Sequence, residues 1–202
     1  MRKPIAVVLL CAAVLSAAVP GSAATVRLGL CSFTGIAAFD APVTLDLAVN
    51  ALVFTGDLQC AGMTGIVAGP PEPPNPTLAE ENFTGTVEVV GEGNLSCLLT
   101  NIRGSLTAIV PTGAGTRDVW NGSVSVVGSL QSAILGTISQ VEHQSFDAES
   151  GEWVTTTADS PGTSIVAGAL TPALSQEDLG TCQEGGVSSL PSSGTAAFAY
   201  SL

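Results

Sequence analysis

Thr86-Val87-Glu88-Val89 alternates polar with apolar residues, and the same alternation returns in Ser105-Leu106-Thr107-Ala108-Ile109 and Ser123-Val124-Ser125-Val126. A period of two with β-branched residues is typical of a strand that buries one face. Roughly ten to twelve short segments of this kind, separated by Gly, Pro or Asn, favour a sandwich or a barrel. We therefore predict an all-β fold: an antiparallel β-sandwich, or a barrel-like form of it, with at most one short helix.

Two turns are predicted from their residues. Asn121-Gly122 tolerates positive φ at both central positions, and we expect a type I′ hairpin turn there. Asp147-Ala148-Glu149-Ser150-Gly151 lies between Phe146 and Trp153, and it suits a type I turn followed by a left-handed glycine. Both turns would connect neighbouring antiparallel strands.

One helix of about two turns is predicted near the C-terminal end. Thr171 would be its N-cap, Pro172 would fill its first position and Gly180 would end it. The proline-rich residues 70–76 lack backbone N–H donors for a central strand, so we expect a stiff, extended surface loop there.

The first residues have the three parts of a secretory signal peptide. Arg2 and Lys3 form a positive start, residues 5–18 are an apolar core, and residues 21–24 are all small. The apolar core is shorter than the roughly 20 residues that span a bilayer, and no later stretch is long or apolar enough to span one. We expect residues 1–24 to be cleaved, after Ala23 or Ala24, which leaves a single secreted, extracellular domain at 25–202 without a transmembrane segment.

The exported chain is acidic. The full sequence has 5 Lys plus Arg against 17 Asp plus Glu, a net charge of −12. Loss of Arg2 and Lys3 leaves three arginines against 17 acidic residues, which is a net charge of −14. Such a surface repels phosphate, so we expect no nucleic-acid partner and no anionic lipid partner.

Four cysteines remain after the signal: Cys31, Cys60, Cys97 and Cys182. An even number in an exported chain indicates two disulfides. Three pairings are open. We favour Cys31–Cys60 with Cys97–Cys182, because the first two cysteines lie on consecutive strand candidates that can pair directly. No C-x-x-C motif is present and the sequence has one histidine, so no metal site is expected.

Short motifs carry a resemblance to a known group. Cys31-Ser32-Phe33-Thr34-Gly35, the segment 54–60 that ends at Cys60, and Cys182 followed by Gly185-Gly186-Val187-Ser188-Ser189 resemble small secreted four-cysteine all-β proteins of actinobacteria. That group has no known activity. The resemblance implies an all-β secreted fold and a high-GC Gram-positive source, and it implies no site residue.

The sequence lacks the residue sets of common catalytic sites, so no catalytic residue, cofactor or enzymatic activity is expected. His143 is the only histidine, and its neighbours form no nucleophile motif, so we interpret it as a solvent-exposed residue at a sheet edge. The acidic pairs Glu80-Glu81 and Glu177-Asp178 are interpreted as solvated carboxylates rather than a glycosidase pair. Residues 147–152 offer oxygen ligands for calcium, but an ordinary turn explains them better.

Trp120 and Trp153 are the candidates for a binding role, because both flank predicted hairpin turns. We expect a secreted, non-catalytic protein with a binding or structural role at or beyond the cell surface, free or associated with the cell wall. One alternative is a carbohydrate-binding module that uses exposed tryptophan. Buried tryptophans would count against it. The other is a carrier of a small apolar ligand, by analogy with acidic actinobacterial chromoprotein carriers of different cysteine spacing, and a deep apolar cleft would favour it.

Overall fold

The computed structural model describes residues 24–67, 77–129, 131–172 and 175–202. Within these residues, nine strands form one antiparallel sheet in the order β5-β4-β3-β2-β1-β9-β8-β6-β7, accompanied by one short helix. The elements are β1 (Ala24–Val43), β2 (Ala48–Val67), β3 (Thr77–Leu95), β4 (Thr100–Gly113), β5 (Thr116–Gly128), β6 (Ser132–Asp147), β7 (Glu152–Asp159), β8 (Thr163–Pro172), helix α2 (Gln176–Glu184) and β9 (Val187–Ser201).

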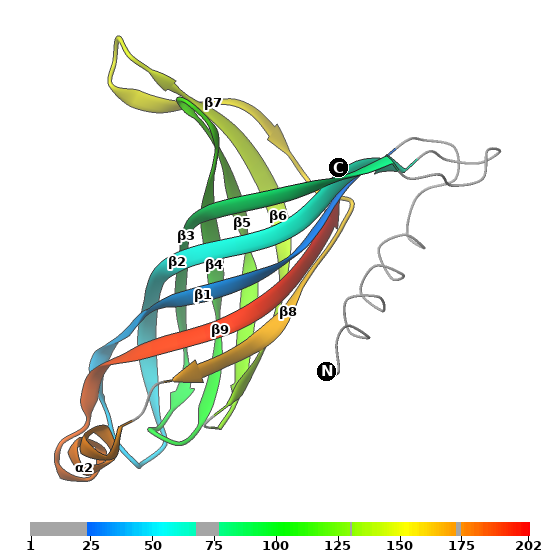
Figure 1. Cartoon of the computed structure of the whole chain (residues 1–202). Coiled ribbons are helices and arrows are strands. Elements are labelled where there is room, and N and C mark those ends of the chain that lie inside the picture. The colour runs from blue at the N-terminus through cyan, green and yellow to red at the C-terminus, as the bar shows by residue number, and fades with distance from the viewer. Residues whose placement is uncertain (1–23, 68–76, 130, 173–174) are drawn as a thin grey trace.

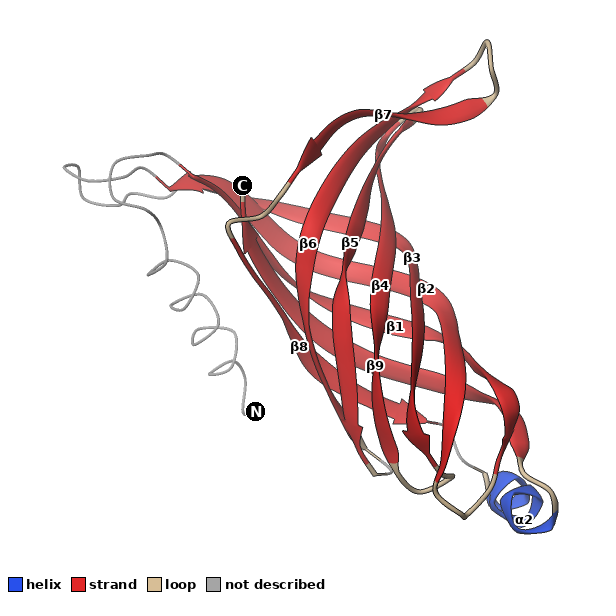
Figure 2. Cartoon of the chain, turned by 180° about the vertical axis from the view of Figure 1, so that it is seen from behind, coloured by secondary structure: helices blue, strands red, loops and turns tan. Residues whose placement is uncertain are grey.

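The sheet closes on itself. A further pairing of β5 with β6 joins strands from opposite ends of the order, so β1 to β6, β8 and β9 form a ring, and β7 branches outward from β6 (Figures 1 and 2). The predicted all-β, antiparallel fold with one short helix is confirmed. One continuous sheet bent into a ring takes the place of the two separate sheets of a sandwich.

The core fills the inside of this ring. Successive side chains of a strand point to opposite faces, so each alternating strand supplies one apolar row to the interior. Every strand of the ring contributes buried residues to the main core cluster, for example Phe33, Leu52, Val87, Ile102, Val124, Ile138, Val166 and Phe198. The branching strand β7 is exposed along its whole length.

Asn121-Gly122 does not form a turn. The prediction of a hairpin there is wrong, because β5 runs through both residues and Gly122 does not have the positive φ that a type I′ turn needs. The β5–β6 register shifts at this point: Asn121 faces Gln140 and Gly122 faces Ile138, so Ser139 is an extra residue on β6. This is a β-bulge, and a glycine inside a strand often marks one.

The predicted helix exists but lies further along the chain. Thr171 and Pro172 belong to β8, and α2 starts after Ser175. The Ser175 hydroxyl accepts a hydrogen bond from the backbone N–H of Asp178, whose carboxylate accepts from the backbone N–H of Ser175. This reciprocal capping box fixes the start, and the helix continues through Gly180.

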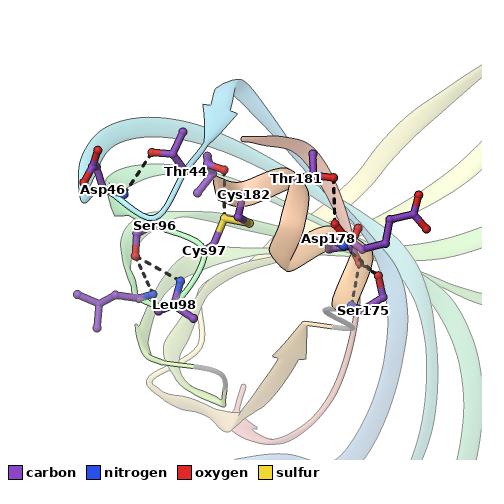
Figure 3. The surroundings of a disulfide bond; sticks show 12 residues. Thr44, Asp46, Ser96, Cys97, Leu98, Ser175, Asp178, Thr181 and Cys182 are labelled. Atoms are coloured by element: carbon purple, nitrogen blue, oxygen red, sulfur yellow. Dashed lines mark hydrogen bonds between the residues drawn. A yellow bond between two sulfur atoms is a disulfide. The ribbon is translucent and has the colours of Figure 1, made fainter. Parts of the chain in front are cut away.

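The predicted cysteine pairing is confirmed. Cys31 on β1 faces Cys60 on β2 in the strand register, and the two form a disulfide. Cys97, in the loop after β3, is bonded to Cys182, the buried residue of α2 (Figure 3). The second disulfide therefore ties α2 to the loops at one end of the ring.

The turn predicted at residues 147–151 is confirmed as the loop between β6 and β7. The carboxylate of Asp147 accepts hydrogen bonds from the Glu149 backbone N–H and the Ser150 hydroxyl, at 2.9 and 2.8 Å, and Gly151 has φ of +73°. These contacts hold the pKa of Asp147 below its usual range, led by the Glu149 backbone bond.

The first and last strands of the ring are neighbours. β1 pairs with β9 over most of its length, and the backbone groups of Thr25 and Leu202 exchange hydrogen bonds of 3.1 and 2.8 Å. The expected signal peptide up to residue 23 and the proline-rich residues 70–76 lie outside the described residues. Within the part of the chain that is described, no helix is long and apolar enough to cross a bilayer.

Candidate binding site

The ring encloses an apolar cavity of about 120 Å³. Every residue that lines it is hydrophobic, and the lining comes from all eight strands of the ring. Phe33 and Phe54 meet edge to face in this lining, with ring centroids 5.8 Å apart. Cys31 of the first disulfide also lines the cavity, so this disulfide holds two neighbouring strands of its wall together.

An aromatic layer covers one end of the cavity. Trp120 lies 5.0 Å from Phe198, 5.6 Å from Phe83 and 5.7 Å from Tyr200, measured between ring centroids. Trp120 and Phe198 are also part of the cavity lining. The layer therefore separates the apolar cavity from a group of charged residues on its other side.

Arg27 lies against this aromatic layer. Its guanidinium carbon is 5.2 Å from the ring centroid of Phe83 and 5.3 Å from that of Trp120, within cation–π range. The residue is 9% exposed, and a buried charge needs partners. Its location explains why three carboxylate and hydroxyl groups gather around it.

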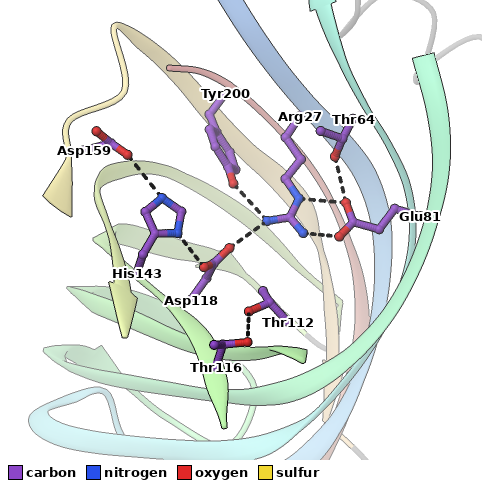
Figure 4. Close-up of polar contacts among 9 residues, drawn as sticks. All are labelled: Arg27, Thr64, Glu81, Thr112, Thr116, Asp118, His143, Asp159 and Tyr200. Atoms are coloured by element: carbon purple, nitrogen blue, oxygen red, sulfur yellow. Dashed lines mark hydrogen bonds and ion pairs between the residues drawn. The ribbon is translucent and has the colours of Figure 1, made fainter. Parts of the chain in front are cut away.

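The partners of Arg27 come from three strands (Figure 4). Glu81 on β3 accepts two hydrogen bonds from the guanidinium, including one from Nε at 3.0 Å. Asp118 on β5 accepts one from Nη1 at 3.1 Å, and the hydroxyl of Tyr200 on β9 lies 3.4 Å from the same nitrogen. Thr64 on β2 donates a further hydrogen bond of 2.7 Å to Glu81.

These contacts shift the acid–base properties of the cluster. Burial alone would lower the pKa of Arg27, but the hydrogen bonds to Glu81 and the interaction with Tyr200 raise it above its usual value. Burial alone would raise the pKa of Glu81, but its bonds to Arg27 and Thr64 lower it. Burial raises the pKa of Tyr200. All three shifts favour a charged Arg27–Glu81 pair beside a neutral tyrosine.

The strands diverge around this cluster. Pairing of β3 with β4 stops at Thr86 and Ile109, and pairing of β6 with β8 stops at Gly136 and Val166. Beyond these points β1, β2, β3, β8 and β9 form one group, and β4 to β7 form another (Figure 2). Because Arg27 is in the first group and Asp118 is in the second, their ion pair connects the two groups across the opening.

His143 reaches the cluster because of the bulge on β6. The extra residue Ser139 reverses the alternation of β6, so Val141 and His143 face the same side as Trp120 and Asp118, their register partners on β5. The prediction that His143 lies at a sheet edge is wrong, because β6 pairs with β5 on one side and β7 on the other.

Both nitrogens of the His143 imidazole contact carboxylates. Nδ1 is 2.7 Å from Asp118 and Nε2 is 3.2 Å from Asp159 (Figure 4). Among the described residues, no hydroxyl or thiol side chain hydrogen-bonds to this ring. In this arrangement neither nitrogen is free to take a proton from a nucleophile. His143 borders an open hollow of about 430 Å³ together with Arg27 and the partners of Arg27.

The two predicted binding tryptophans lie in different environments. Trp120 is 4% exposed and belongs to the core, so its indole offers no exposed face for stacking on a sugar. Trp153 on β7 is 39% exposed and packs against Phe146, and the guanidinium carbon of Arg117 lies 4.1 Å from its ring centroid. Arg117 therefore covers one face of the only exposed indole in the described residues.

The sequence analysis did not single out Arg27 and Asp118. Its interpretation of Glu81 as a solvated carboxylate is wrong, because Glu81 is paired with the guanidinium of Arg27. Arg27, Glu81 and Asp118 lie far apart in the sequence, and only the ring brings them together. One signal was available: Arg27 is a lone cation in the apolar start of a strand candidate, where a charge needs a buried partner.

Comparisons with known proteins add no assignment. No protein-family model matches the chain, and no curated protein or solved structure matches it either. Among the described residues, no group of three or more His, Cys, Asp or Glu side chains is placed to hold a metal ion.

Proposed function

We propose that this is a secreted, non-catalytic binding protein that takes up a small apolar molecule inside its ring of strands. The observation that carries the proposal is the cavity of about 120 Å³ with an entirely hydrophobic lining. An apolar cavity of about 150 Å³ stays dry and takes up benzene or xenon. The cavity here suits a ligand of similar size.

The secreted location rests on the predicted signal peptide and is supported by the two disulfides, which persist in oxidising compartments. The non-catalytic role is supported by His143, whose two ring nitrogens are both engaged by carboxylates. The carbohydrate alternative loses its main support, because Trp120 is buried and Arg117 covers a face of Trp153.

Binding of toluene, followed by calorimetry or by ligand-observed NMR, tests this proposal. We expect saturable binding with one molecule per chain. Ala108 is 4% exposed and lines the cavity, so Ala108→Leu should fill space that the ligand uses and lower the affinity at least about tenfold, the factor for about 1.4 kcal/mol.

The matched control is Ala51→Leu, because Ala51 is an exposed residue of β2 and adds the same side chain outside the ring. This variant should bind toluene as the original chain does. Absence of saturable binding to the original protein, or equal loss in both variants, would contradict the proposed function.

A further inference from the structure

The strand β7 has a free edge. It is the last strand of the sheet order, it pairs with β6 alone among the described residues, and all eight of its residues are exposed. Together with the end of β6, it projects away from the ring (Figures 1 and 2). A free edge presents unpaired backbone N–H and C=O groups, which can pair with a strand of another chain.

This edge lacks most of the features that prevent such pairing. Proteins protect exposed edges with lysine, proline or bulges, and β7 contains neither lysine nor proline. Its centre is Val154-Thr155-Thr156-Thr157, four β-branched residues that favour strand pairing. One bulge is present, because Thr156 is an extra residue in the β6–β7 register. The hydroxyl of Thr156 donates a hydrogen bond of 2.9 Å to the carbonyl oxygen of His143, which holds this residue against β6.

The hairpin of β6 and β7 also exposes large apolar side chains. Phe146 is 46% exposed, Trp153 is 39% exposed and Val154 is 45% exposed. Successive side chains of a strand point to opposite faces, so Trp153 and Val154 expose apolar surface on both faces of β7. A strand added beside β7 would place its own side chains next to both of them.

The charge of this hairpin indicates which kind of strand it favours. Five carboxylates lie on β6, on β7 or in the loop between them: Glu142, Asp147, Glu149, Glu152 and Asp159. No lysine or arginine follows Arg117 in the sequence. The guanidinium of Arg117 lies over the ring of Trp153 and donates a hydrogen bond of 2.8 Å to Gln144. The free edge is therefore acidic, which favours a positively charged partner.

A second copy of the chain is a poor partner for this edge. Glu152 and Asp159 occupy the two ends of β7, so pairing of β7 with itself in register places acidic residues opposite each other in both directions. Like charges directly opposite in a sheet are destabilising, whereas opposite charges are stabilising. The edge suits a strand with lysine or arginine near both ends.

We propose that the free edge of β7 is an interaction surface that binds an extended, positively charged segment of another protein by strand addition. The backbone of β7 supplies the hydrogen bonds that give affinity, and Glu152 and Asp159 select basic residues near the ends of the partner strand. This surface lies outside the ring, so the inference does not depend on the ligand proposed for the cavity.

Two peptides of the same length as β7 test this proposal by calorimetry. Both alternate valine with threonine, and one carries lysine at its two ends where the other carries glutamate. We expect saturable binding of the lysine peptide, at least about fivefold tighter than that of the glutamate peptide. Amide hydrogen exchange should slow in β7 when the lysine peptide is bound, and it should stay unchanged in β2, which is paired on both sides.

A charge reversal at the edge is the second test. Glu152→Lys should weaken binding of the lysine peptide about fivefold, because it replaces an attraction by a repulsion. Glu88→Lys is the matched control, because Glu88 is exposed and lies on β3 where this strand pairs with both β2 and β4. The control makes the same change in net charge and should alter the affinity less than about twofold.

Four results would each overturn the inference. They are no saturable binding of the lysine peptide, equal affinity for both peptides, equal effects of Glu152→Lys and Glu88→Lys, and unchanged hydrogen exchange in β7 on binding. A dimer in sedimentation without peptide, with β7 protected from exchange, would assign the edge to a second copy instead. Toluene binding tests the proposed function separately, and its failure would leave this inference standing.

Discussion

Arg27 shows how a single buried charge organises one end of this molecule. Its two carboxylate partners lie on strands that do not neighbour β1, and its aromatic neighbours lie on the cavity side. Breaking a buried ion pair leaves the remaining charge buried without a partner, so the stability of the protein should be sensitive to the loss of one residue of the cluster. The most direct probe is Glu81, whose pKa is lowered by Arg27.

Glu81→Gln should make the acid stability of the protein less dependent on pH. The folded-state pKa of Glu81 lies below its ordinary value of 4.5, so the ionised carboxylate stabilises the fold. This contribution is fully present above about pH 4.5 and is lost as the pH falls through the lowered pKa. The difference in unfolding free energy between the original protein and the variant should therefore shrink between pH 6 and pH 3 in urea titrations.

Glu80→Gln is the control for this experiment, because Glu80 is exposed and the adjacent residue on the same strand. Its stability difference from the original protein should stay small and nearly constant over the same range. A constant difference for Glu81→Gln as well would mean that the Arg27–Glu81 contact does not contribute to stability.

At the residue scale, the sequence predicted the disulfides better than it predicted the surroundings of Trp120. The disulfides depend on the number and order of the cysteines, whereas the surroundings of Trp120 depend on how the ring of strands closes. The disulfides Cys31–Cys60 and Cys97–Cys182 followed from an even cysteine count and from strand order. The buried environment of Trp120 did not follow from the sequence, because the sequence predicted a hairpin turn at Asn121-Gly122, directly after this residue. Once β5 runs straight through these residues, Trp120 points into the ring.

At the level of elements, the bulge between β5 and β6 decides which side chains enter the site. An added Cβ at Gly122 would lie 1.9 Å from the carbonyl oxygen of Thr137, so the closeness of the two strands requires glycine there. The same dipeptide that favours a turn also suits a bulge, and local sequence does not separate the two. The pairing of β5 with β6, which follows later in the chain, determines that Asn121-Gly122 lies at a bulge and not in a turn.

Gly122→Ala should destabilise the protein by about 1–3 kcal/mol, the usual cost of forcing extra atoms into a packed site. Gly180→Ala is the contrasting change, because Gly180 lies inside α2 and an added Cβ meets nothing within 4 Å. It should stabilise α2 by up to about 1 kcal/mol. Urea unfolding of both variants measures the two effects. Equal effects of the two substitutions would argue against a tight bulge.

The helix α2 depends on its disulfide. Cys182 is its buried residue, and the remaining residues face solvent at least in part. In a Cys97→Ala, Cys182→Ala double variant, we expect amide hydrogen exchange to increase in α2 while the strands stay protected. Closure of an 85-residue separation predicts a loss of about 4–5 kcal/mol from the chain-entropy model.

The matched double variant Cys31→Ala, Cys60→Ala removes a disulfide between paired strands, with a separation of 29 residues. It should cost less, about 3–4 kcal/mol, and leave α2 protected. Unchanged exchange in α2 after removal of the Cys97–Cys182 bond would show that packing alone holds the helix.

At the scale of the whole molecule, the ring is completed by contacts between distant parts of the chain. β1 pairs with β9, and Arg27 contacts Tyr200 across 173 residues of sequence. The sequence indicated the strands but not which strands pair to close the ring, because alternation identifies a strand and does not identify its pairing partner. The cavity and the polar cluster exist only once the ring is closed.

Folding should be slow, on the milliseconds-to-seconds scale or slower. Pairing of strands that are distant in the sequence loses loop-closure entropy before the stabilising contacts form. Stopped-flow refolding of the Trp153→Phe protein, with its disulfides intact, isolates the fluorescence of Trp120 in the core. Recovery of the native signal within the instrument dead time would contradict this expectation.

The hydrogen bonds between Thr25 and Leu202 have a consequence for chain connectivity. Because the ends of the described domain lie side by side, a short Gly-Ser linker from Leu202 to Thr25 would let the chain be reopened elsewhere. The exposed residues 148–151 between β6 and β7 are the natural site for the new ends. A circular permutant opened there should keep the strand ring and both disulfides, and it should place fused partners on the projecting hairpin instead of beside β9.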